Sequence, residues 1–143
     1  MPPRPHEEVL SRYVTVASFS LSVFRHINRQ RGLPPSRDSH AYLTVQGTLN
    51  EPVGNVSQIE VQIGVDDTPA SPASNADAVL AVGAVIQVKP VVSAVVDLPA
   101  ADFERLWAMA VAGHVKYGYL AFLKPHHGRA RIVSVSFSNE ADG

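Results

Sequence analysis

The sequence predicts a mostly β domain, either an antiparallel β-sandwich or an open barrel of about seven strands, with one amphipathic α-helix near the C-terminal end. Two observations support this prediction. Apolar residues alternate with polar ones in short stretches separated by turn residues, which is the period of strands with one solvent-facing side. Only residues 99–112 have the apolar spacing of a helix. Because parallel strands need long crossover connections, usually helical, a single helix favours antiparallel pairing.

The first half of the chain contains three predicted strands. They cover 13–27, 40–49 and 59–65, and the last shows the clearest alternation of apolar and polar residues. Between the first two strands, residues 28–39 include a glycine and a Pro-Pro pair, which favour irregular structure. Residues 66–78 are rich in Ser, Ala, Pro and Asp, so we expect a mobile loop that contributes little buried surface.

The second half begins with a nearly continuous apolar stretch, residues 79–98. Lys89 and Pro90 interrupt it, and proline cannot donate a hydrogen bond to a strand ladder. We therefore expect two strands, or one bent strand, with the break at these residues. Residues 115–124 and 129–139 alternate again and predict a closing hairpin.

The predicted helix begins at Pro99 and ends before Gly113, two residues that suit the first and the following position of a helix. Its apolar residues recur at helical spacing and predict one buried stripe. This stripe consists of Phe103, Leu106, Trp107, Ala110 and Val111. We expect Trp107 to be buried beneath the helix.

The length of 143 residues fits one domain, which we place at 11–139 between a flexible tail at 1–10 and a frayed end at 140–143. The chain has no cysteine, which excludes disulfides and thiolate chemistry. The first residues lack the apolar run of a secretion signal, and no stretch reaches the roughly 18 apolar residues of a membrane helix. We therefore expect a cytoplasmic protein that does not cross a membrane.

Charge and hydrophobicity constrain the partners. The 12 basic and 13 acidic residues give a net charge of −1, which argues against a nucleic-acid partner. Charged residues make up 17% of the chain, below the roughly 25% typical of soluble domains. Residues 79–98 are apolar on both faces of the predicted strands, so one face needs a cover beyond the single helix. These features predict a homo-oligomer, most simply a two-fold dimer. They are also consistent with a different protein as the partner.

Basic side chains gather in two predicted loops, one within residues 25–40 and one at the turn 125–128. Arginine and histidine suit an anionic ligand because they donate charge-assisted hydrogen bonds. The candidate anion or ligand site consists of Arg25, Arg29, Arg31, His126, His127 and Arg129. It requires the two loops to meet at one end of the sheet; otherwise these residues are solvated loop positions.

No catalytic, metal or nucleotide motif stands out. The sequence lacks HExxH, GxSxG, GxGxxG and GxxxxGK[ST], and the adjacent histidines of the 125–128 turn diverge rather than share one ion. We therefore expect no metal and no cofactor. The favoured function is a non-catalytic binding or assembly module acting through a sheet face or its loops. The alternative is a domain that binds a small ligand or an anion through the arginines and histidines above. This alternative includes an enzyme.

Overall fold

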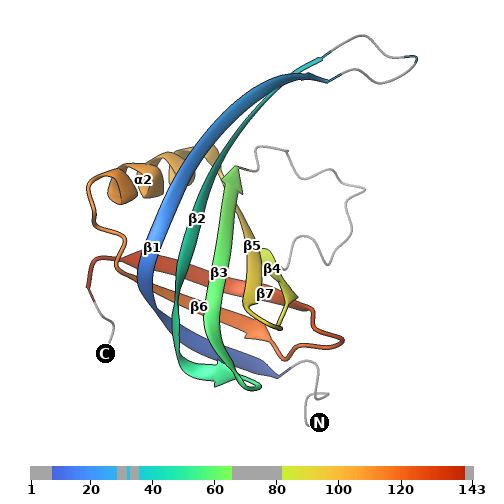
Figure 1. Ribbon diagram of the computed structural model, residues 1–143, viewed down its shortest axis with the longest axis vertical. Helices are drawn as coiled ribbons and strands as arrows, with labels where there is room; N and C mark the ends of the chain where they lie inside the picture. Colours follow the sequence, from blue (N-terminus) through green and yellow to red (C-terminus); the bar gives the residue numbers. More distant parts are fainter. Residues whose placement is uncertain (1–7, 29–31, 33–35, 66–81, 141–143) are drawn as a thin grey trace.

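A computed structural model of the chain describes residues 8–28, 32, 36–65 and 82–140. Within these residues it contains seven strands and the helix α2 (Figure 1). Their bounds are β1 (Val9–Asn28), β2 (Ser36–Val53), β3 (Val56–Val65), β4 (Gly83–Gln87), β5 (Val92–Leu98), α2 (Ala100–Val111), β6 (Tyr117–Leu123) and β7 (Ala130–Ser138). The predicted β class, the strand number, the helix and the strand break around Lys89 and Pro90 are confirmed.

The strands form a closed barrel in the order β1-β2-β3-β5-β4-β7-β6, and β6 pairs back onto β1. In this seam Val9 lies opposite Leu123 and Thr15 opposite Tyr117. The sandwich alternative was therefore wrong, and the barrel alternative was nearer the structure. A sandwich keeps two separate sheets, whereas here one continuous sheet closes on itself and leaves few open edges.

Not all neighbouring strands are antiparallel, which corrects the prediction. β3 and β5 run parallel, with Ile59 opposite Val92 and Val65 opposite Leu98. The connection between them spans residues 66–91, which exceeds the dozen or so residues a parallel crossover needs, and it contains β4. β4 then pairs antiparallel with both β5 and β7.

A β-bulge in β1 changes which side chains face the core. Val16 lies opposite Gly47, whereas Ser18 lies opposite Gln46, so Ala17 is the extra residue. An extra residue shifts the alternation by one, and the inner face passes from even to odd positions. Val16 before the bulge and Leu21 after it both pack against the core.

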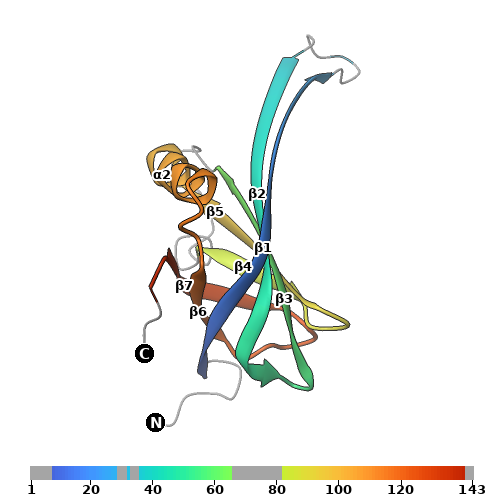
Figure 2. The same ribbon diagram turned by 60° about the vertical axis from the view of Figure 1, so that its left-hand side comes forward.

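β1 and β2 continue past the barrel as a two-stranded arm, defined here as Ser22–Asn28 and Ser36–Tyr42 (Figures 1 and 2). The pairing of β2 with β3 starts at Leu43 and Ile63, so the arm lies beyond that end of β3. The prediction of irregular structure over 28–39 was therefore wrong at its edges, because the hairpin ladder continues to Asn28 and resumes at Ser36.

α2 lies at the barrel end where β3 and β5 finish (Figure 1). Phe103, Leu106 and Ala110 are buried in the core cluster, as the predicted stripe requires. Two members of the stripe differ from the prediction. Trp107 is only partly buried, and Val111 is 66% exposed. Both residues therefore lie at the edge of the stripe rather than in the buried core.

The predicted tails and loop are only partly described. β1 begins at Val9, so Val9 and Leu10 belong to the barrel and not to the tail predicted over 1–10. Glu140 follows β7 in a bend. The remaining tail residues and the loop predicted over 66–78 lie outside the described residues, and those expectations stay predictions.

Candidate functional site

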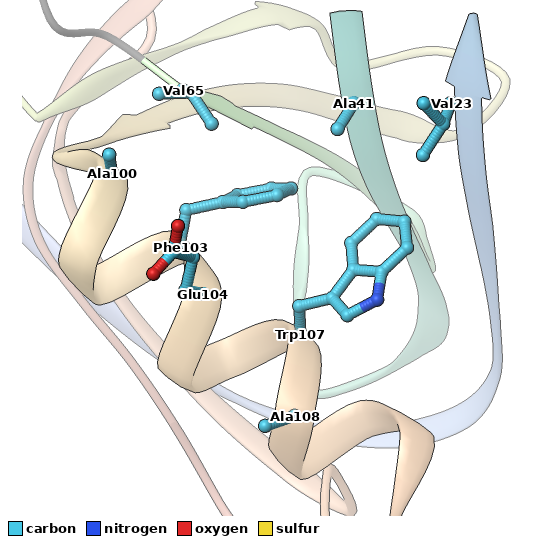
Figure 3. Close-up of a pocket in the computed structure, with 8 residues that line it drawn as sticks. All are labelled: Val23, Ala41, Val65, Ala100, Phe103, Glu104, Trp107 and Ala108. Carbon is cyan, nitrogen blue, oxygen red and sulfur yellow. The ribbon is translucent and has the colours of Figure 1, made fainter.

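The helix–arm groove is an apolar hollow of about 550 Å³ between α2, the base of the arm and the end of β3 (Figure 3). It is lined by Val23, Ala41, Val65, Ala100, Phe103, Glu104, Trp107 and Ala108. Hollows of this size and apolar character are typical of ligand and partner sites. Phe103 reaches the groove from the buried core, whereas Val23 and Val65 are exposed.

The groove takes its shape from α2 and from the pairing of the arm. Phe103 and Trp107 lie one turn apart on the helix, with ring centroids 5.6 Å apart at an interplanar angle of 45°, and both project toward β1 and β2 (Figure 3). Val23 lies directly opposite Ala41, so the two side chains share one face of the arm. Val23 is 69% exposed despite its apolar side chain.

The groove offers binding surface but little chemistry. Glu104 is the only charged side chain among the described residues that line it. General acid–base or nucleophilic catalysis needs two or more reactive groups within hydrogen-bond reach, and this lining supplies a single carboxylate. The lining is therefore an apolar surface with one carboxylate.

β1 borders the groove and has an open edge, defined here as Ser18–Asn28. β6 pairs with β1 as far as Thr15, and the Val16 amide donates to the Lys116 carbonyl at 2.9 Å. Beyond this point β1 pairs only with β2 among the described residues. Residues 13–24 contain neither a charge nor a proline. Natural edge strands usually carry such residues to prevent pairing with another chain, so this edge is unprotected.

A second hollow, the basic pocket, lies between β4 and the β6–β7 hairpin and has a volume of about 350 Å³. It is lined by Ala84, Val85, Ile86, Leu123, Lys124, His126, Arg129, Ala130 and Arg131. Lys124, His126 and Arg129 lie in the connection between β6 and β7, and Arg131 lies in β7. The apolar residues come mainly from β4. The pocket combines a basic rim with an apolar floor.

The structure places Arg25 far from the His126–Arg129 part of the predicted anion site. His126 and Arg129 line the basic pocket, beside the start of β1 where Val9 pairs with Leu123. Arg25 lies opposite Ser39 in the arm, toward the other end of this 20-residue strand. At roughly 3.3 Å per residue, about 50 Å of strand separates Val9 from Arg25. The arm and the turn therefore do not meet.

Of the three remaining residues of the predicted site, the structure describes only His127. His127 occupies the turn with a φ of 54°, and its ring centroid lies 4.1 Å from that of His126. Arg29 and Arg31 lie outside the described residues. Sequence reasoning missed Lys124 and Arg131, although both lie close to the predicted turn in the sequence. It also missed the groove, because nothing in the sequence indicates that the arm lies beside α2.

Among the residues that the structure describes, no group of three or more His, Cys, Asp or Glu side chains is placed to hold a metal ion. No described helix is long and apolar enough to cross a membrane.

Comparison with known proteins does not assign the chain to a family. No family model, no curated protein and no solved structure matches it. The open edge, the helix–arm groove and the basic pocket are the surface features that point to a function.

Proposed function

We propose that the protein is a non-catalytic assembly module in which two copies associate through the open edge of β1 beside the helix–arm groove. The observation that supports this most directly is the open edge itself, which extends over Ser18–Asn28 and has no charge or proline in its first seven residues. Such an edge presents unpaired backbone groups that favour pairing with another strand.

Among the described residues, no third strand pairs with the arm. It is a two-stranded ribbon that projects beyond the barrel (Figure 2). Isolated two-stranded hairpins are at best marginally stable in water, and a third strand or a packing partner is usually required. A second β1 strand on the open edge gives a four-stranded arm shared by two copies.

The length of the open edge selects one symmetric register. If two copies pair antiparallel along all of Ser18–Asn28, Ser18 lies opposite the partner's Asn28 and Val23 lies opposite the partner's Val23. In this register the partner strand ends where β6 begins to pair with β1, so the barrel seam stays intact. The two arms then extend in opposite directions from the shared edge.

The same arrangement covers the apolar residues beside the groove. Val23 is 69% exposed and Phe19 is 37% exposed, although both lie on the inner face after the bulge. A strand added to the edge extends this face and buries part of both side chains. Cross-strand apolar pairs of this kind stabilise sheets by about 0.2–1 kcal/mol each.

A single cysteine tests both the association and its register. The natural chain contains no cysteine, so Val23→Cys introduces the only thiol. Because position 23 is self-opposed in the proposed dimer, mild oxidation is expected to produce a covalent dimer in high yield. Thr48→Cys, on the exposed face of β2 between paired strands, is the matched control and is expected to remain monomeric on a denaturing gel.

A charge exchange at the same position provides an independent test. Val23→Lys and Val23→Glu each place like charges opposite one another and are expected to give monomers near 15.4 kDa by light scattering. An equimolar mixture of the two variants is expected to recover a dimer. The proposal is wrong if the unmodified chain stays at the monomer mass up to high micromolar concentration.

A further inference from the structure

We propose that the basic pocket is a binding site for a small amphiphilic anion, a carboxylate or phosphate attached to a short apolar chain. The pocket lies away from the open edge of β1, so this inference does not depend on self-association. It retains the His126–Arg129 half of the predicted anion site and adds an apolar floor that the sequence did not reveal.

The floor of the pocket is formed by the exposed face of β4. Ala84 and Ile86 flank the buried Val85, and Ile86 is 47% exposed. Leu123, at the end of β6, adds a partly buried apolar side chain from the neighbouring hairpin. A large apolar side chain left in solvent beside a hollow is a favourable surface for the apolar part of a ligand.

The rim of the pocket is cationic. Lys124, Arg129 and Arg131 line it together with His126, and none of the described lining residues carries a carboxylate. Arg131 lies opposite Ala84 in the β4–β7 ladder, so its side chain starts from the same face as the floor. Guanidinium groups donate paired hydrogen bonds to carboxylate and phosphate oxygens, which makes an anionic head group the matching chemistry.

Backbone hydrogen bonds in the turn between β6 and β7 hold His126 and Arg129 next to each other. The His126 amide donates to the Arg129 carbonyl at 2.8 Å, and the Arg129 amide donates to the His126 carbonyl at 3.1 Å. His127 and Gly128 between them both have positive φ, the conformation of a tight two-residue hairpin. Glycine or asparagine is usual at the position of His127, and such unfavourable conformations concentrate at binding sites.

The volume of the pocket limits the ligand. About 350 Å³ is near the lower end of the range for small-molecule sites. A chain of about eight carbons with one head group is a suitable probe. Octyl phosphate and octanoate supply the two candidate head groups, whereas octanol and inorganic phosphate each supply only one half of the proposed ligand.

The test is a calorimetric titration of the full chain with these four probes below their aggregation limits. Octyl phosphate or octanoate is expected to bind at least about tenfold more tightly than octanol and inorganic phosphate. Arg129→Gln and Ile86→Ser are each expected to weaken binding by about tenfold, through the head group and the chain respectively. Lys116→Gln, the same loss of charge in the connection before β6, is the control and is expected to leave binding unchanged.

Three outcomes overturn the proposal. Equal binding of inorganic phosphate and octyl phosphate indicates a simple anion site, and equal binding of octanol indicates an apolar site. Co-sedimentation with phosphatidylglycerol vesicles without binding of either free amphiphile indicates a membrane surface instead. Repeating the titration with Val23→Lys separates this site from assembly, because that variant is expected to remain monomeric and still bind the amphiphile.

Discussion

At the residue scale, Gly47 shows how one missing side chain permits the bend in β1. It lies in β2 opposite Val16, next to the bulge at Ala17. A Cβ atom at this position would overlap the Thr15 carbonyl oxygen and lie 2.8 Å from Cγ1 of Val14. Backbone atoms cannot move aside as a side-chain end can, so only glycine fits where the two strands approach.

Gly47→Ala is therefore expected to lower the free energy of unfolding by about 1–3 kcal/mol, the usual range for overpacking. Gly64→Ala is the matched control, because the nearest atoms to its added Cβ lie at an ordinary 3.6 Å. We expect that control to change stability by less than about 0.5 kcal/mol. Denaturant midpoints of the two variants measure the difference, and equal midpoints would show that β1 relaxes around the added methyl group.

Trp107 illustrates what periodicity predicts for a single residue and where it fails. Helical spacing placed Phe103 and Trp107 on one stripe, and the structure confirms that both face the strands. Spacing does not indicate how wide the opening beneath the helix is. Phe103 enters the core, whereas Trp107 remains at its margin and lines the groove.

At the scale of elements, α2 acts as the cover of one barrel end. Its buried residues join the same core cluster as the inner residues of the strands. Proline at the N-cap and Gly113 with a φ of 77° after the last turn define its ends. The helix therefore contributes to stability through the few side chains that enter the barrel.

Phe103→Ala is expected to cost about 3–5 kcal/mol, because it removes a large side chain that is 5% exposed. Val111→Ala, at the exposed edge of the same helix, is expected to cost less than about 0.5 kcal/mol. Thermal or urea unfolding of both variants tests the assignment. Similar losses at the two positions would mean that α2 packs on the barrel in a different rotation.

At the scale of the whole molecule, amide exchange distinguishes the barrel from the arm. The buried strands β3 and β5 are paired on both edges, so their amides are expected to exchange slowly in every variant. Amides of Ser18–Asn28 are expected to be protected in the natural chain and to exchange faster in Val23→Lys. Equal protection of this edge in both proteins would contradict its burial in a dimer.

Strand order is where prediction from sequence ended. Alternation identified the segments because the period of a strand is local, and the closing hairpin from β6 to β7 followed from its short turn. The parallel pair of β3 with β5 and the seam of β1 with β6 join segments that lie far apart in the chain. The alternation within a strand does not indicate which distant strand it pairs with, so a barrel and a sandwich were equally consistent with the sequence.

The same limit applied to the candidate sites. Local composition identified the histidine turn, but it did not indicate that the arm lies beside α2.

The seam between β1 and β6 also has a consequence for how the protein is made. β1 leaves the ribosome long before β6 has been translated. Val9 therefore cannot pair with Leu123 until more than a hundred further residues have been synthesised. Contacts over such long separations are characteristic of slow folding, because the connecting chain must first be brought together. During that interval β1 has a free edge along its whole length. The nascent chain is therefore most prone to aggregate before its final hairpin has emerged. Expression at a lower temperature slows both synthesis and aggregation, and we expect it to raise the yield of soluble protein.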